Sequence, residues 1–199
     1  MLTSAIERLK ECIMEEDGNI KEAANLLDAI GMLQGHFEAY QNVKRICDLN
    51  IEVDEIRNTL ENRIREHFKL VGEHVATCLE EEEDRSDLAE VSEEQKEVDQ
   101  SLSDVCLVVD ALGDSARKKH LDSFCVDLLE PYEHKFGKKK SFVEDVGSLE
   151  QIDRRFAWFR RLLRAMDERF AHVFPSHWPF HYKLTALFLL QVRVVLTFP

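Results

Sequence analysis

The chain has 199 residues, of which 44% are hydrophobic and 33% charged, and its formal net charge is −13. An acidic chain, with a pI near 5.1, is a poor general binder of nucleic acid, because neutralising phosphates needs a basic surface. Only seven glycines and four prolines are present, too few for the turns of an all-β protein. We therefore expect an all-α fold without a sheet, built as an elongated helical rod of stacked helical bundles.

Residues 1–79 are predicted to form a first domain, a helical hairpin followed by a long helix. Apolar residues recur at helical spacing over 2–13 and over 20–40, with a break at Gly18. From Ile46 to Leu79 they step by three and four, the narrow seam of a coiled-coil-like helix. A helix over 43–79 would be about 50 Å long, which suggests a rod-like body.

Residues 80–99, "EEEEDRSDLAEVSEEQKEVD", are predicted to be an acidic linker or a frayed helix. They hold eleven acidic and two basic residues, a net of −9 out of the chain's −13. Charge of one sign with few apolar residues favours a solvated segment. A calcium loop is disfavoured, because this stretch lacks the glycine that such a loop needs at its turn.

Residues 100–199 are predicted to form a second, truncated helical bundle. Helices are expected over 101–112, ending at Gly113, over 115–136, over 148–171 and over 180–197, with Pro131 kinking the second or ending it early. The run from Leu184 to Phe198 is the most apolar, but at fifteen residues it is shorter than the roughly 20 that span a membrane. We interpret it as a core-facing helix that lacks its partner.

The stretch "DRRFAWFRRLL" (153–163) mixes arginines with aromatic residues. On a helical wheel its apolar residues, with those up to Phe170, fall within an arc of about 160°. Arg155 and Arg169 lie among these apolar positions, so each needs to snorkel or to find a partner. The apolar face consists of Phe156, Trp158, Phe159, Leu162, Leu163, Met166 and Phe170, and the arginine face of Arg154, Arg160, Arg161 and Arg164.

The arginine face, with the basic loop of Lys138, Lys139 and Lys140, is the candidate interaction surface. Single-strand binders need aromatic and basic side chains on one exposed surface, and here the two point apart. A basic face suits an anionic membrane or an acidic partner. The simplest alternative is a solvated face that pairs with Asp153, Asp167 or Glu168.

No reactive site stands out. Nucleophile elbow, P-loop and glycine-rich dinucleotide motifs are absent from the sequence. His172, His177 and His181 surround a proline turn without a nearby cysteine, which is weak support for zinc, and His67 and His74 suit the flank of the long helix. We expect no enzyme activity, no cofactor, no bound metal and no small-molecule substrate.

The start of the chain and its cysteines both point to a reducing compartment. Met1, Leu2 and Thr3 lead directly into an amphipathic pattern without a signal-peptide core. Five cysteines, an odd number without a C-x-x-C pair, are expected to be buried thiols. They are Cys12, Cys47, Cys78, Cys106 and Cys125.

Four blocks resemble a known family. They are "EAANLLDAIGMLQGHFEAYQNVKRICDL" (22–49), "LSDVCLVVDALGDSARKKHLDSFC" (102–125), "IDRRFAWFRRLL" (152–163) and "FPSHW" (174–178). In content, order and spacing they resemble the vacuolar protein sorting 53 subunits of the Golgi-associated retrograde protein (GARP) complex and the related endosomal recycling complex (EARP). Where that family has a proline after the second block's "CLVxxxL", this chain has Asp114, a good N-cap residue.

The resemblance implies a non-enzymatic subunit of a multisubunit tether in retrograde transport from endosomes to the trans-Golgi network. It implies a peripheral position on the cytosolic face of these membranes and assembly with the other subunits through helical bundles, with SNAREs and an anionic membrane surface as further partners. The family has a coiled coil upstream and helical domains downstream, so we expect this chain to be a partial one. The alternative from the residues is a peripheral membrane module that binds anionic lipid through the basic helix face.

Overall fold

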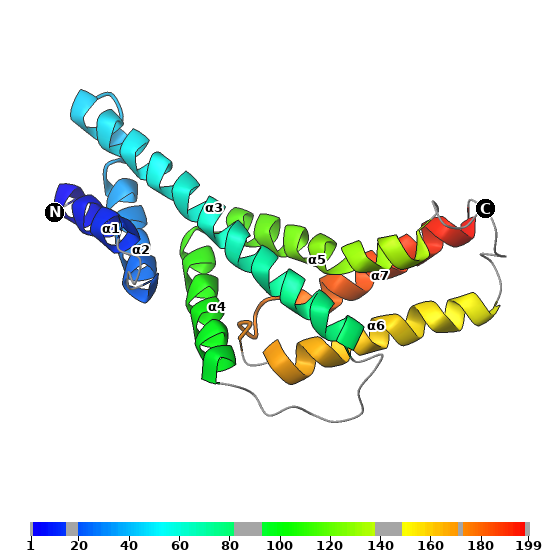
Figure 1. The fold of residues 1–199 in the computed structure, drawn as a ribbon. Helices are drawn as coiled ribbons and strands as arrows, with labels where there is room; N and C mark the ends of the chain where they lie inside the picture. Colours follow the sequence, from blue (N-terminus) through cyan, green and yellow to red (C-terminus); the bar gives the residue numbers. More distant parts are fainter. Residues whose placement is uncertain (1, 15–19, 82–92, 138–148, 171–172, 198–199) are drawn as a thin grey trace. The chain divides into compact units, whose positions relative to one another are not determined.

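The computed structural model describes residues 2–14, 20–81, 93–137, 149–170 and 173–197. Within these ranges it contains seven α-helices, one 3-10 turn and no strand, so the predicted all-α class is confirmed (Figure 1). The helices are α1 (Leu2–Met14), α2 (Ile20–His36), α3 (Lys44–Glu81), α4 (Glu93–Ala111), α5 (Asp114–Phe136), α6 (Leu149–Phe170) and α7 (Phe180–Thr197), with the 3-10 turn η1 (Glu38–Tyr40) between α2 and α3.

The predicted long helix is confirmed. α3 has 38 residues, about 57 Å at 1.5 Å per residue. Its buried residues follow the predicted seam, and each adds about 1.5–3 kcal/mol of apolar burial. They are Leu49, Val53, Ile56, Leu60, Ile64, Phe68, Val71, Val75 and Leu79.

The second helix ends earlier than predicted. α2 stops at His36, not at Tyr40, and the Phe37 amide closes it by donating to the carbonyl oxygens of both Leu33 and Gln34. Phe37 and Tyr40 continue the apolar spacing but are exposed. The apolar spacing therefore predicted two surface aromatic residues to lie on the core face of the helix.

One boundary in the second half differs from the prediction, and one of the two alternatives for Pro131 is wrong. α4 begins at Glu93, so the last part of the predicted acidic linker is helical. α5 continues through Pro131 to Phe136, the predicted end, so Pro131 does not end the helix early and a kink there stays a prediction. Proline removes one backbone hydrogen bond, but Leu128, Leu129 and Tyr132 are buried on both sides of it, and this packing holds the helix together.

Gly113 makes the turn between α4 and α5. Its φ is +97°, in the left-handed region that favours glycine after a helix end. Its amide donates to the Asp110 carbonyl at 3.0 Å. The Arg117 side chain then bonds Asp110 at 2.9 Å and also Asp114, the first residue of α5. This bridge across the turn fixes where α5 starts.

The described helices group into two compact units. Unit 1 comprises Met1–His67 and Gln100–His120, and unit 2 comprises Phe68–Asp99 and Leu121–Pro199. α3, α4 and α5 each contribute residues to both units. The predicted division of the chain into domains 1–79 and 100–199, joined by a linker over 80–99, stays a prediction.

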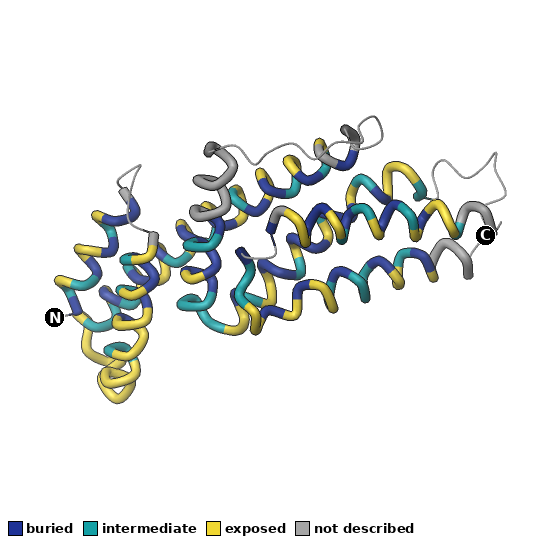
Figure 2. The backbone as a smooth tube through the Cα atoms, turned by 90° about the horizontal axis from the view of Figure 1, so that it is seen from below, coloured by how far each residue is buried: buried dark blue, intermediate teal, exposed yellow. Residues whose placement is uncertain are grey.

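Unit 1 has an aliphatic core. α1 and α2 form an antiparallel hairpin joined by Arg8 and Glu22, whose side chains meet at 2.9 Å. The Arg63 side chain of α3 donates to the Ile13 carbonyl at the end of α1 at 2.6 Å. Figure 2 shows buried residues in dark blue recurring along the helices, with exposed ones in yellow between them. The unit 1 core includes Ile6, Leu9, Leu27, Ile30, Val53, Leu102, Val105 and Val109.

Unit 2 is a helical bundle with an aromatic core, made by α6, α7 and parts of α3 and α5. The rings of Phe68 in α3 and Phe124 in α5 lie 5.1 Å apart. Phe188 of α7 stacks on Phe159 of α6 with centroids 4.0 Å apart and meets Tyr132 of α5 edge-on at 5.2 Å. Ring pairs of this kind add about 0.5–1.5 kcal/mol each beyond area burial, so they fix how these helices pack.

Candidate interaction surface

α6 carries the arginine-aromatic stretch, and its inner face confirms most of the predicted apolar arc. Trp158, Phe159, Leu162, Met166 and Phe170 are all buried. The prediction was wrong for two residues at the edge of the arc. Phe156 is 37% exposed and Leu163 is half-buried, because they lie at the flank of the helix.

Arg155 is buried among the aromatic residues, as its place on the wheel required. Only 3% of its surface is exposed. Its Nη1 donates to the Tyr132 hydroxyl at 2.8 Å, and its guanidinium carbon lies 5.3 Å from the Phe136 ring centroid. These contacts replace part of the lost hydration with a charge-assisted hydrogen bond and a cation–π contact. The predicted need for a partner is therefore confirmed at Arg155, whereas the Arg169 side chain lies outside the described residues.

The hydroxyl of Tyr132 is held in its neutral form. Burial raises the pKa of Tyr132, and the hydrogen bond from Arg155 offsets only part of this rise. The oxygen of a neutral phenol can accept a hydrogen bond from the guanidinium while the ring stays within the aromatic core. Arg155 and Tyr132 therefore join α6 to α5 and are not available to a partner.

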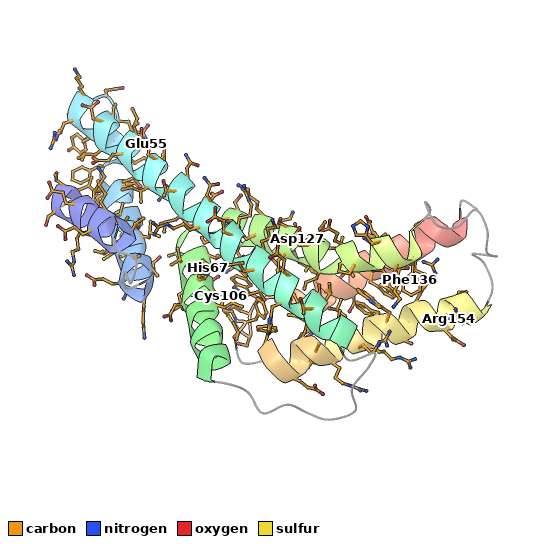
Figure 3. All side chains as sticks on the ribbon, in the orientation of Figure 1. Glu55, His67, Cys106, Asp127, Phe136 and Arg154 are labelled. Carbon is orange, nitrogen blue, oxygen red and sulfur yellow. The ribbon has the colours of Figure 1, made fainter. Side chains whose placement is uncertain are left out.

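The arginine face of α6 lies on the outside of unit 2. Arg154, Arg160 and Arg164 are exposed and Arg161 is half-buried; Figure 3 labels Arg154 near the start of α6. Asp153, Asp167 and Glu168 are exposed on the same helix. The face therefore alternates positive and negative charges and is not uniformly basic.

The rest of the candidate surface is not brought together with this face. Lys138, Lys139 and Lys140 lie outside the described residues, so the joint basic surface stays a prediction. Asp167 faces His181 of α7, with Oδ1 3.4 Å from Nε2. This contact is an ion pair only when His181 is protonated, and it places the C-terminal part of α6 beside the start of α7.

α7, predicted as a core-facing helix that lacks its partner, has exposed apolar side chains as well as buried ones. Phe180, Leu184, Phe188 and Val192 are buried in unit 2. The side chains of Tyr182, Leu189 and Leu190 are exposed. The signal was present in the sequence, since α7 is apolar around most of its circumference, but periodicity cannot show which of two apolar faces is covered.

The other chemistry-bearing residues form no cluster in the part of the chain that is described. No group of three or more His, Cys, Asp or Glu there could hold a metal ion. His177 and His181 are exposed, and His172 is outside the described residues. Along α3, His67 is half-buried and His74 exposed.

Four of the five cysteines can be described, and all four are free thiols. Cys12, Cys106 and Cys125 are buried, and Cys47 is half-buried. Burial raises the pKa of Cys106 and of Cys125 to about 12. A thiol that ionises only at such a pH is a poor nucleophile at neutral pH, so these cysteines serve the core. Among the described helices, none combines the length and apolarity needed to cross a membrane.

Comparison with known proteins identifies the family. The family model described as "Vps53, N-terminal" matches residues 1–197. The chain belongs to the Vps53 N-terminal family. The resemblance found in the four sequence blocks is thereby confirmed over nearly the whole chain.

Two Vps53 relatives from Arabidopsis thaliana show the extent of the similarity. The chain is 33% identical to vacuolar protein sorting-associated protein 53 A over 193 residues, which is 97% of this chain and 20% of that protein. It is 28% identical to vacuolar protein sorting-associated protein 53 B over 174 residues, 87% of this chain and 27% of that protein. The chain thus spans about a fifth to a quarter of the length of these relatives. No solved structure matches it.

Proposed function

We propose that this chain is a non-enzymatic subunit, or part of one, of a multisubunit vesicle-tethering complex in retrograde transport from endosomes to the trans-Golgi network. The observation that carries the proposal is the match of the Vps53 N-terminal family to residues 1–197. The two Arabidopsis relatives are named for vacuolar protein sorting. An all-helical chain with one helix of 38 residues suits a protein that assembles through helical bundles.

The chemistry of the surface supports a binding role. The exposed residues of α6 and α7 include arginines, carboxylates and apolar side chains, the kinds of side chain that protein interfaces use. The proposed partners are the other subunits of a GARP-type or EARP-type complex, with SNAREs as further ones. The proposed location is the cytosolic face of the trans-Golgi network and of endosomes.

Affinity purification from cells tests this proposal. The full chain with an affinity tag is expected to co-purify at least one other subunit of these tethering complexes, identified by mass spectrometry. An unrelated all-helical protein with the same tag is the control. Enrichment of no such subunit above this control, from cells that contain all of them, would remove the proposal.

The alternative, a module that binds anionic lipid through Arg154, Arg160, Arg161 and Arg164, has weaker support. Asp153, Asp167 and Glu168 are exposed on the same helix and would be repelled by an anionic surface. Flotation with vesicles of phosphatidylcholine, with and without phosphatidylserine, tests it. Binding that requires phosphatidylserine, falls with salt and is lost in Arg160→Glu/Arg164→Glu would favour this alternative.

A further inference from the structure

α7 has two apolar faces, and the described residues of unit 2 cover only one of them. Phe180, Leu184, Phe188 and Val192, spaced by four residues, are buried. The opposite side carries Tyr182, Ala186, Leu189 and Leu190, here called the α7 outer stripe. Tyr182 is 77% exposed, Leu189 48% and Leu190 54%. The outer side of a helix on a bundle is normally polar, so this stripe requires a separate explanation.

The spacing of the outer stripe suits another helix. Its members are separated by four and then three or four residues, which places them in one line along α7. From Tyr182 to Leu190 the line extends about 12 Å, or roughly two turns. Two helices pack by setting such rows of side chains into each other's grooves. The shape of the stripe is that of one half of a helix–helix contact.

α6, the neighbour of α7, carries exposed arginines. Phe156 of α6 meets Phe188 of α7 edge-on at 5.4 Å, and the Asp167–His181 contact joins the other ends of the two helices, so α6 and α7 run antiparallel. Arg160 and Arg164 follow Phe156 at intervals of four residues, each turned about 40° further from α7. The exposed side of α6 therefore begins at Phe156, where α6 meets α7, and continues to Arg160 and Arg164.

We propose that the α7 outer stripe, with Phe156, Arg160 and Arg164, is the docking surface for an amphipathic helix of a companion subunit, one whose apolar row is flanked by carboxylates. The inference rests on the proposed assembly role and names the surface and the partner's chemistry. The apolar row of the partner would cover Tyr182, Leu189 and Leu190. Its carboxylates would meet Arg160 and Arg164, because opposite charges beside an apolar contact select the partner and its register.

Charge favours a protein helix over a membrane as the occupant. Asp153, Asp167 and Glu168 are exposed among the arginines, so an anionic bilayer would meet repulsion at several points of α6. A protein helix can place carboxylates opposite Arg160 and Arg164 alone. The alternation of charge that weakens lipid binding is therefore compatible with recognition of one helix.

The test uses the full chain, expressed in cells with the photoreactive amino acid p-benzoylphenylalanine in place of Tyr182. After irradiation, mass spectrometry identifies the peptide joined to position 182. We expect a segment of a companion subunit with apolar residues at helical spacing and Asp or Glu beside them. The same photoreactive residue at Leu70, which is 62% exposed on α3 of the same unit, is the control and should not join that segment.

Matched substitutions then test the surface itself. Leu189→Glu/Leu190→Glu should lower the yield of the cross-link at least about tenfold, the effect of losing a central apolar contact. Arg160→Glu/Arg164→Glu should also lower it, and added salt should weaken the wild-type contact. Leu70→Glu, which places a carboxylate on an exposed leucine elsewhere in unit 2, should leave the yield unchanged.

The outcomes separate this inference from the proposed function. If companion subunits co-purify but position 182 joins a second copy of the chain, a lipid or nothing, the docking surface is wrong and the assembly role stands. If no companion subunit co-purifies but position 182 joins an acidic amphipathic helix of another protein, the surface stands and the assembly role is wrong. If neither occurs, both are overturned.

Discussion

The two units bury different kinds of side chain. Unit 1 packs Leu, Ile and Val along α1, α2 and α3, and its buried polar residue is His120. Unit 2 packs rings from α3, α5, α6 and α7, and its buried polar residue is Arg155. Aliphatic side chains tolerate exchange for others of similar volume, whereas ring pairs depend on angle and distance. We therefore expect unit 2 to depend more strongly on individual residues.

The strongest test of this difference is Phe188→Ala. Phe188 contacts Tyr132, Phe156 and Phe159, so its loss removes several ring pairs and leaves a cavity. We expect the free energy of unfolding to fall by about 3–5 kcal/mol. Both tryptophans, Trp158 and Trp178, are buried in unit 2, so tryptophan fluorescence during urea unfolding reports this unit. A loss below about 1 kcal/mol would mean that the rings are loosely packed.

The buried charge of unit 2 provides the next largest effect. Tyr132→Phe removes the acceptor of the Arg155 hydrogen bond and should cost about 1.5–3 kcal/mol, the usual range for a bond to a charged group. Arg155→Met removes the charge itself and should be neutral or stabilising. With Met at position 155, Tyr132→Phe should cost almost nothing. An equal cost of Tyr132→Phe in both backgrounds, measured by urea unfolding, would exclude coupling between the two side chains.

The residues that the sequence predicted well are those governed by a single period. The seam of α3 follows from apolar spacing alone, because one face of the helix is buried along its length. Arg155 could also be predicted, since its angle on the wheel placed it among aromatic residues. In these cases the local pattern and the tertiary packing agree.

The residues that were missed need information from outside their own helix. Phe37 and Tyr40 keep the spacing of α2 but are exposed beyond its end. The exposure of Tyr182, Leu189 and Leu190 depends on which side of α7 the rest of the bundle covers. A helical wheel gives angles within one helix and does not show which neighbour covers each face.

An aliphatic exchange in unit 1 should have a smaller effect. Leu27 is buried in α2, and Leu27→Met keeps its volume and flexibility. We expect the free energy of unfolding to fall by less than about 1.5 kcal/mol. The urea dependence of amide hydrogen exchange in α1 and α2 measures this change. A loss as large as that of Phe188→Ala would remove the distinction between the two cores.

Acid should weaken unit 1 through His120. Burial lowers the pKa of His120. The carboxylate of Glu61 raises this pKa, whereas the positive charges of Lys119 and Arg65 lower it further. The unfolded chain therefore takes up this proton more readily, so stability is full above the ordinary pKa of about 6.5 and falls as the pH drops below it. Urea unfolding at about pH 7.5 and 5.5 should show a loss of stability that His120→Gln reduces. An unchanged pH dependence in the variant would assign the loss to other groups. Arg155, the buried charge of unit 2, does not titrate in this range.

The smallest effect is expected at the surface of unit 1, where Lys10 of α1 pairs with Glu52 of α3. Both side chains are partly exposed, so water and salt screen the pair, and Lys10→Ala should cost about 0–1 kcal/mol. Any loss should shrink in high salt, whereas the loss caused by Phe188→Ala should persist because it arises from packing. Urea unfolding of both variants at low and high salt measures this contrast. A large, salt-resistant loss for Lys10→Ala would show that the position of α1 on α3 depends on this pair more than on the aliphatic core.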